Sequence, residues 1–546
     1  MISEVNNCSE FPPLLPVCYD EMFKEQVAFF YFHLTRKDSS DVLELSKKLT
    51  DVLMLLKNQM DVHGKTDTLL LYLELFYRML GQTRDILFGK GEQELSFMMI
   101  LCFYEVFPIL AIYAVHRFVQ PVNGFVPFGS WRDIKYLCEY IRLHSKKREN
   151  HELIHICIRL MNSQLKRDLE TWKFSVFAGS RNHISNVAKW IPREKKKFDW
   201  LFDMLVIDWM KINMPHYFKN ISTSWIPAFT KSKGIYRKKI AGLNKLLDTT
   251  EIKQCSQKID ELKPSSVSCY ATLKQPWLLE MDSFKKYFDL PNFSRRVGCA
   301  NFYPVSIFVK RAVSLIGSAV DSYDFLLLNK QWSWFSNSIS KHGFENTLPV
   351  IDVSFSIQKN DSEAFYYAIG YAILIAERSS FGKKIMAVDH NSTWINLESC
   401  SSFVHMIETI FTNLKSNSNT IMNVNDAFDT IMLSLTLTKC TKRFIDKSTL
   451  IFFSDFLQYK SKRSLSRFPN IVFWNLGKYK IGELPCGIHH KTLVYSGVGN
   501  GILKGLPDLL ENSKIGGKCT MFENILTILK NSRYDILSNY LRDLQK

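Results

Sequence analysis

The sequence lacks the cysteine and histidine patterns of zinc sites and of disulfide-bonded domains. Its twelve cysteines are scattered over 546 residues, with no C-x-x-C pair and no close histidine spacing. Free thiols are typical of a reducing compartment, so we expect a cytoplasmic protein. The first 16 residues lack the basic start and the apolar centre of a signal peptide.

An uncharged apolar run of membrane-spanning length is also missing. Residues 97–115 come closest, but Glu105 and Pro108 lie at the middle of that run. A carboxylate at the centre of a bilayer costs about 2.5–3.5 kcal/mol on insertion scales. The sequence therefore predicts a buried helix pair broken at Pro108, and no transmembrane segment.

Motifs of nucleotide binding and catalysis are incomplete. The glycine-rich run 497–501 is too short for a P-loop and no Gly-Lys-Ser/Thr follows it, so it predicts a tight strand-to-helix turn. Ser454, His490 and Asp455 lack the strained Gly-x-Ser-x-Gly turn of a serine hydrolase. Asp352 and Asp455 could serve two-metal hydrolysis, but two hydroxyls occupy positions where further carboxylates would be needed. We therefore predict that the protein is not an enzyme and has no catalytic residues.

Length and charge set broader limits. A chain of 546 residues is too long for one hydrophobic core, so we expect two or more domains. Hydrophobic residues make up 46% and charged residues 23% of the sequence, which is typical of globular rather than disordered proteins. Seventy Lys and Arg against 53 Asp and Glu leave a net charge of +17, which favours a polyanionic partner. Charge alone does not choose among nucleic acid, an acidic protein and an anionic membrane surface.

The first half of the chain has the periodicity of helices. Apolar residues recur every three or four positions, as at Leu70 and Leu73, and almost nothing alternates with period two. We predict a flexible arm at residues 1–20 and an all-α domain at residues 21–335, with a connector near residues 240–290. No fixed repeat length is visible, so a regular solenoid is not indicated.

In the second half, short apolar strands alternate with helical patterns. One expected strand ends at residue 352, and four more cover residues 384–388, 449–453, 470–475 and 492–496. The expected helices cover residues 362–378, 403–414 and 425–437. Strands that alternate with helices favour a doubly wound parallel sheet. We therefore predict an α/β domain over residues 340–546.

Asp352, Ser354 and Ser356 alternate where the first of these strands ends. The loop leaving a parallel strand can turn all three oxygens towards one point outside the sheet, where such folds bind ligands. Asp455 follows the strand at residues 449–453, which would place its carboxylate beside Asp352. Carboxylate and hydroxyl oxygens suit Mg²⁺. The alternative is a polar strand end with a helix-capping serine.

This motif resembles the metal-ion-dependent adhesion site of a von Willebrand factor A domain. Short blocks of the chain are also similar, in order, to domain-of-unknown-function family 2828, which has members in large DNA viruses, plants and fungi. The blocks are FGSWRD at 128–133, AKWIP at 188–192, YRK at 236–238, FSD at 453–455, IVFWNL at 471–476 and SGVGNGIL at 496–503. That family resembles the TROVE module of Ro-type ribonucleoproteins, a ring of helical repeats joined to a von Willebrand A domain. The resemblance covers roughly residues 60–515.

The resemblance implies a TROVE-like or HEAT-like helical domain followed by a von Willebrand A-like domain. It places Asp352, Ser354, Ser356 and Asp455 in the first and third metal loops. Ser354 and Ser356 would bind Mg²⁺ directly, the two carboxylates would act through water, and the open position would accept a carboxylate from a protein partner.

The second metal loop departs from the family pattern. A threonine is expected just before the helix at 425–437, but Met422 occupies the aligned position and Thr420 lies two residues away. Phe355 crowds the first loop, where related sites often carry glycine. Because Mg²⁺ requires near-ideal octahedral geometry, the site either holds Mg²⁺ with extra water or has lost its metal.

Basic clusters lie beside aromatic residues in the helical half. Proteins bind single-stranded nucleic acid with such a combination, because the cations contact phosphates and the bases stack on the aromatic rings. The resemblance adds that Ro-type modules carry their basic surface on the helical part. The alternative is that the cations cover solvated helix faces while the rings lie in the core. The candidate nucleic-acid-binding residues are Lys195, Lys196, Lys197, Arg237, Lys238 and Lys239.

Three functions follow from these patterns. The first is a non-enzymatic scaffold whose von Willebrand A-like domain binds a protein that offers an acidic residue. The second is a Ro-like, RNA-binding ribonucleoprotein component. The third is a structural or assembly protein of a large-virus particle, virion-associated and with an inactive metal site. The oligomeric state is not indicated.

Overall fold

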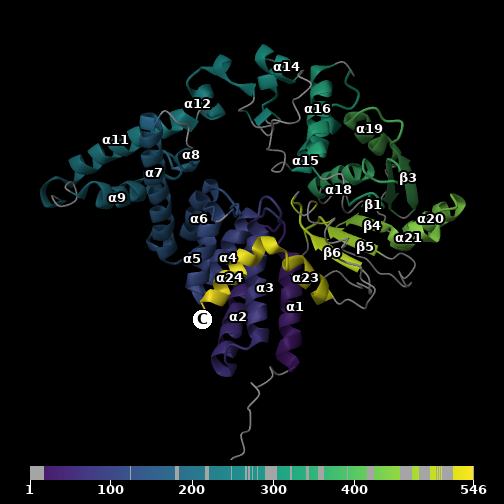
Figure 1. Cartoon of the computed structure of the whole chain (residues 1–546), viewed down its shortest axis with the longest axis horizontal. Coiled ribbons are helices and arrows are strands. Elements are labelled where there is room, and N and C mark those ends of the chain that lie inside the picture. The colour runs from purple at the N-terminus through teal and green to yellow at the C-terminus, as the bar shows by residue number, and fades with distance from the viewer. Residues whose placement is uncertain are drawn as a thin grey trace, which may run out of the picture.

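The computed structural model has a helical N-terminal region and a C-terminal α/β region (Figure 1). In Figure 1 the chain passes from the N-terminal helices, over an arch of short helices, to the sheet, and its last two helices return to its beginning. The structure describes residues 17–122, 124–178, 184–215, 221–247, 249–264, 267, 271–272, 275–279, 281–288, 304–319, 322–339, 343–354, 362–389, 391–414, 423–454, 470–478, 492–499, 501, 503, 506 and 521–544.

The N-terminal region is built from helices that pack around a shared apolar core, and α3 and α4 are buried over most of their length. In α3, for example, Thr66 caps the first turn by accepting a hydrogen bond from the Leu69 N–H at 3.4 Å, and Leu73 and Phe76 are buried on the inner face. The helices of this region are α1 (Val17–His33), α2 (Ser39–His63), α3 (Asp67–Arg84), α4 (Gln93–Val106), α5 (Pro108–Val119), α6 (Trp131–His144), η1 (Arg148–Asn150), α7 (Glu152–Ala178), α8 (Val187–Trp190), α9 (Asp199–Asn213) and α11 (Ile221–Leu247).

The predicted break at Pro108 is confirmed. Helix α4 ends at Val106 and α5 begins at Pro108, because proline has no N–H to donate within a helix but fits its first turn. Glu105 is exposed, so its carboxylate remains in contact with water. Among the described helices, none combines the length and the apolar character needed to cross a bilayer.

Short helices form the arch between the two regions. Around residues 240–290 the chain builds a small separate core, in which Leu262, Leu278 and Phe284 pack with Leu327 of α16. The helices here are α12 (Thr250–Cys255), η2 (Ile259–Glu261), η4 (Pro276–Leu279), α14 (Asp282–Phe288), α15 (Val305–Ser314) and α16 (Tyr323–Ser338).

The α/β region contains a six-stranded sheet in the order β3-β2-β1-β4-β5-β6. All neighbours are parallel except β2 and β3, so the parallel sheet expected from the sequence is present. The strands are β1 (Thr347–Asp352), β2 (Lys384–Val388), β3 (Ser392–Asn396), β4 (Thr449–Ser454), β5 (Asn470–Asn475) and β6 (Thr492–Ser496). The helices are α18 (Ser362–Ala376), α19 (Phe403–Asn413), α20 (Val424–Leu437), α21 (Lys442–Lys447), α23 (Met521–Leu529), η7 (Ser532–Tyr534) and α24 (Asp535–Asp543).

Strand β3 was not expected from the sequence. It is the antiparallel edge of the sheet, and only Ile395 among its five residues is buried. An edge strand with one buried side chain has no apolar run, so local patterning does not reveal it.

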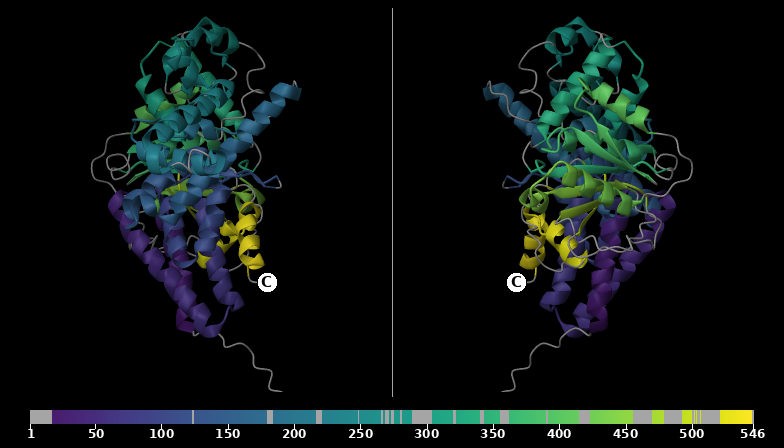
Figure 2. Two further views of the ribbon diagram at one scale, coloured as in Figure 1. Left: turned by 90° about the vertical axis from the view of Figure 1, so that its left-hand side faces the viewer. Right: turned by 90° about the vertical axis from the view of Figure 1, so that its right-hand side faces the viewer.

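The two C-terminal helices pack on the N-terminal helices. Helix α23 contacts α1, α3 and β6, and α24 contacts α3. In both views of Figure 2 the yellow C-terminal helices lie beside the purple N-terminal helices. Tyr540 of α24 stacks on Tyr113 of α5 with 3.6 Å between ring centroids. The C-terminal helix α23 therefore lies between the N-terminal helices and the edge strand β6 of the sheet.

A buried lysine holds the end of α1. The Lys90 side chain, 3% exposed, donates hydrogen bonds to the backbone carbonyls of Tyr31 and Leu34, the latter at 3.1 Å. Burial lowers the pKa of Lys90 to about 7, although the nearby charge of Glu92 acts in the opposite direction. The ammonium therefore loses its proton far more easily in the folded protein than in the unfolded chain.

This pKa shift predicts a pH dependence of stability. Above pH 7 the folded protein releases the Lys90 proton while the unfolded chain keeps it, so stability rises with pH until the ordinary lysine pKa is reached. From about pH 7 to about pH 8.5 the free energy of unfolding should rise by about 1.5 kcal/mol, measured by urea denaturation. The rise should disappear in Lys90→Met and persist in Lys65→Met, which replaces an exposed lysine. An equal rise in both variants would contradict this role of Lys90.

Candidate functional site

The carboxyl edge of the sheet between β1 and β4 is the candidate site. The strand order reverses at this point, because the chain leaves β1 for β2 on one side and later returns to form β4 on the other. Ile351 pairs with Phe453, so Asp352 and Ser454 are neighbours at the ends of their strands. In open parallel sheets, ligands bind outside the carboxyl ends at such a reversal.

Asp352 is buried and hydrogen-bonded within the site. One carboxylate oxygen accepts the Ser354 N–H at 2.9 Å and the other accepts the Ser454 hydroxyl. Burial raises the pKa of Asp352 above its ordinary value, which the two serines partly offset and the neighbouring Asp389 reinforces. A cation at this edge would favour the ionised form and relieve that cost.

Asp389 is a site residue that the sequence reasoning missed. It directly follows β2, and its backbone carbonyl accepts the Asn423 N–H at 2.7 Å. This bond anchors the start of α20, the segment next to the predicted second metal loop, at the same edge as Asp352. The rule that selected Asp352 and Asp455, an acidic residue at the end of a strand, would have selected Asp389 from the strand at 384–388.

The structure describes two of the four predicted metal ligands. Asp352 and Ser354 lie together at the carboxyl edge, whereas Ser356 and Asp455 lie outside the described residues. Phe355, Thr420 and Met422 are likewise outside them. The Asp352 carboxylate accepts hydrogen bonds from the Ser354 backbone, the Ser354 side chain and the Ser454 hydroxyl. A carboxylate has about four lone-pair sites, so it can still accept a metal-bound water, and these residues fit a Mg²⁺ site.

The other half of the carboxyl edge is covered by the end of α1. The Ser496 hydroxyl donates to the Phe32 carbonyl at 3.2 Å, and the Asn475 amide donates to the Ser496 oxygen at 3.3 Å. Arg36 Nη1 donates to the Leu476 carbonyl at 2.7 Å. The ends of β5 and β6 are therefore occupied by the helical region, and the ends of β1, β2 and β4 form the candidate binding edge.

The predicted basic clusters lie side by side. Glu194 accepts a hydrogen bond from Arg237 at 2.7 Å and also lies 3.7 Å from Lys233, which ties the loop before α9 to α11. Of the six candidate residues, Lys239 is half-buried and the other five are exposed. The exposed five are Lys195, Lys196, Lys197, Arg237 and Lys238.

The aromatic residues beside these clusters divide between core and surface. Tyr236 is fully buried, and its hydroxyl donates to the Asn162 side chain at 2.8 Å, so it belongs to the core. Phe198 is buried too, at 7% exposure. Trp190 and Trp200 are half-buried. The rings therefore do not all line a surface. Trp190 is a half-buried ring with three cations, Arg132, Lys135 and Lys189, within 6.0 Å of its centre.

Comparison of the chain with protein-family models finds no match, and comparison with curated proteins finds none. In the described part of the chain no group of three or more His, Cys, Asp and Glu side chains is placed to hold a metal ion.

Proposed function

We propose that this protein is a non-catalytic scaffold that binds a protein partner at the carboxyl edge of a von Willebrand A-type domain. The observation that carries the proposal is the position of Asp352 and Ser454, which meet where the strand order reverses. The order of six strands with an antiparallel β3 at the edge supports this type of domain. The return of α23 and α24 to the N-terminal helices supports a TROVE-like closed arrangement.

The site would bind Mg²⁺ through Ser354 and Ser356 directly, and through Asp352 and Asp455 by way of water. Bound Mg²⁺ would supply an open coordination position for a carboxylate of the partner. The raised pKa of Asp352 supports this assignment, because a bound cation would favour the ionised form of this buried carboxylate.

Metal addition tests the proposal. Mg²⁺ or Mn²⁺ should raise the thermal midpoint of the wild-type protein above its value in EDTA, because a ligand at 100 times its Kd adds about 2.7 kcal/mol to stability. Asp352→Asn should abolish the rise, since it removes the charge and keeps the shape. In EDTA this variant should be at least as stable as wild type, because an amide does not suffer the desolvation cost of a buried carboxylate.

Asp446→Asn is the matched control, because Asp446 is an exposed residue of α21 away from the sheet edge. It should respond to metal as wild type does. Equal midpoints in metal and in EDTA for wild type would contradict the metal site. That result would instead favour a packing surface without metal in a larger assembly, such as a virus particle.

We propose RNA binding by the helical region as a second function. The observation that favours it is the ion pair between Glu194 and Arg237 at 2.7 Å, because Glu194 directly precedes the predicted cluster 195–197 and Arg237 belongs to the cluster 237–239. Phosphate binding by such a surface releases counterions, so RNA affinity should fall steeply as salt rises.

A further inference from the structure

Four cations meet at the junction of α6 with the loop between α8 and α9. Arg132 and Lys135 lie one turn apart on α6, and Arg193 and Lys197 lie on the loop. The Lys135 ammonium is 4.3 Å from the centre of the Phe198 ring. Burial lowers the pKa of Lys135, and the charges of Arg132, Arg193 and Lys197 lower it further. The Lys197 ammonium approaches the same Phe198 ring at 5.5 Å. Lys135 is therefore close enough to the other three cations for their charges to act on it.

These four cations have no counter-charge in the described part of the chain, where none of them forms an ion pair. The nearby acids serve other groups. Glu194 binds Arg237 and Lys233, Glu251 binds Lys189 at 2.9 Å, and Asp199 accepts the Lys195 N–H at 2.9 Å. Like charges gathered without acids raise the energy of the folded protein, and an anionic ligand would offset that cost.

An aromatic ring lies within this group of cations. Trp190, at the end of α8, is half-buried, and its ring centre is 5.9 Å from the Arg132 guanidinium and 6.0 Å from the Lys135 ammonium. Lys189 approaches the same ring at 5.8 Å. Proteins bind single strands of nucleic acid with this combination, because phosphates contact the cations and a base stacks on the ring.

We propose that Arg132, Lys135, Arg193 and Lys197 bind the phosphates of a single-stranded nucleic acid while one base stacks on Trp190. The proposal rests on the second function above and locates it at a specific site. Sequence reasoning selected Lys197 but neither Arg132 nor Lys135, because these two lie on a helix more than fifty residues earlier in the chain. The cations would also attract an acidic protein, but its carboxylates would not stack on the Trp190 ring as a nucleic-acid base does.

Fluorescence anisotropy with a labelled oligouridylate, and with the matching oligothymidylate, tests the site. Lys135→Ala/Arg193→Ala should weaken binding about tenfold or more, and should reduce the slope of log affinity against log salt by about one for each phosphate that is no longer neutralised, between about 50 and 200 mM salt. Trp190→Leu should weaken binding at least about fivefold without changing that slope, and Trp190→Phe should restore most of the affinity. The two oligonucleotides distinguish an RNA site from a DNA site.

Lys442→Ala/Arg443→Ala is the matched control, because it removes the same charge from exposed positions on α21. Each variant is compared only after its thermal midpoint shows that it is folded. If wild type binds neither oligonucleotide, both the site and the RNA function are wrong. If wild type binds and the control weakens binding as much as the junction double variant does, the RNA function stands and the site is wrong. The proposal is overturned if Lys135→Ala/Arg193→Ala weakens oligonucleotide binding while Trp190→Leu does not, and if poly-glutamate displaces the labelled oligonucleotide as well as unlabelled oligonucleotide does. The surface would then bind acidic proteins.

Discussion

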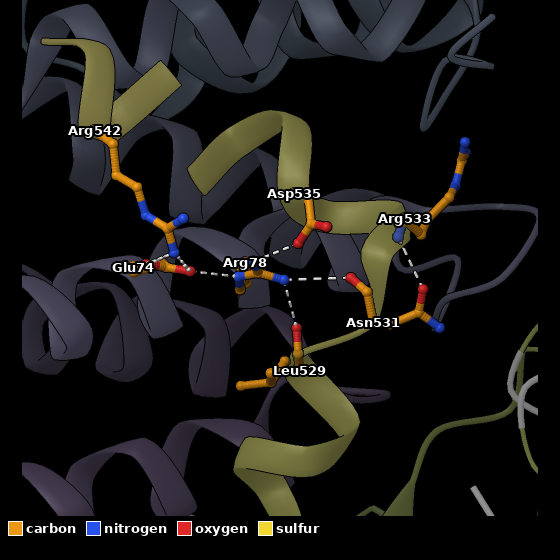
Figure 3. Close-up of polar contacts among 7 residues, drawn as sticks. All are labelled: Glu74, Arg78, Leu529, Asn531, Arg533, Asp535 and Arg542. Carbon is orange, nitrogen blue, oxygen red and sulfur yellow. Dashed lines mark hydrogen bonds and ion pairs between the residues drawn. The ribbon is translucent and has the colours of Figure 1, made fainter. Parts of the chain in front are cut away.

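Replacing Arg78 with methionine should lower the free energy of unfolding by about 3 kcal/mol or more, measured by urea denaturation. Arg78 lies on α3 and is 5% exposed. Its guanidinium binds Glu74 at 2.9 Å and Asp535 at 2.6 Å, and it donates to the backbone carbonyls of Leu529 and Asn531 at 3.1 and 3.2 Å (Figure 3).

The size of this effect follows from what the substitution leaves behind. Two of the four acceptors are backbone carbonyls at the end of α23 and the turn after it. The buried Leu529 carbonyl would lose the Arg78 donor, whereas the Asn531 carbonyl would keep its bond from the Tyr534 N–H at 3.0 Å. A buried acceptor without a partner costs about 1–3 kcal/mol, and a carboxylate such as Glu74 without its closest cation costs more. Arg78 thus stabilises the interface by which the C-terminal helices hold the N-terminal region.

Arg542→Met provides the control for Arg78. Arg542 binds the same Glu74 at 3.1 Å (Figure 3), but its side chain is 60% exposed. An exposed ion pair contributes about 0–1 kcal/mol, so this variant should be close to wild type. Equal destabilisation of the two variants would show that the hydrogen bonds from Arg78 to the carbonyls add little.

Replacing Gly499 with alanine should destabilise the protein by about 1–3 kcal/mol. A Cβ at Gly499 would lie 2.2 Å from the Gly89 carbonyl oxygen and 2.9 Å from that of Lys90. Both neighbours are backbone atoms, so neither can move aside as a flexible side chain would. The glycine run after β6 therefore lets the sheet pack directly against the loop between α3 and α4.

Gly234→Ala is the matched control for Gly499→Ala. Gly234 lies within α11, and a Cβ there would meet nothing within 4 Å. Alanine in a helix interior is favoured over glycine by about 0.5–1 kcal/mol, so this variant should be stabilised. Thermal and urea unfolding of the two variants should shift in opposite directions. A neutral result at Gly499 would show that the two loops are not in close contact.

Local pattern in the sequence was sufficient for most of the secondary structure. The break at Pro108 and the strands at 449–453 and 470–475 depend on the chemistry of neighbouring residues, namely a missing N–H and unbroken apolar runs. Strand β3 was missed because its hydrogen bonds to β2, rather than buried side chains, make it a strand.

The candidate site was predictable to the extent that it depends on strand ends. Asp352 follows from its position after an apolar strand, and the same rule would have found Asp389. The sequence analysis also predicted that the strands ending at Asp352 and before Asp455 are neighbours, and the pairing of β1 with β4 confirms that order. The meeting of Asp352 with Ser454 depends on the register of that pairing, which the strand pattern does not contain.

The sequence by itself determined the kind and the approximate length of most elements, and the polar residues at their ends, since these depend on propensity and periodicity over a few residues. Only the tertiary structure decided which of those residues meet. Arg132 and Lys135 lie beside Arg193 and Lys197, and Arg78 binds Asp535, 457 residues later in the chain. Contacts between such distant residues form when the apolar faces of helices and strands pack together and buried charges find partners. Both depend on the whole chain rather than on a few neighbouring residues.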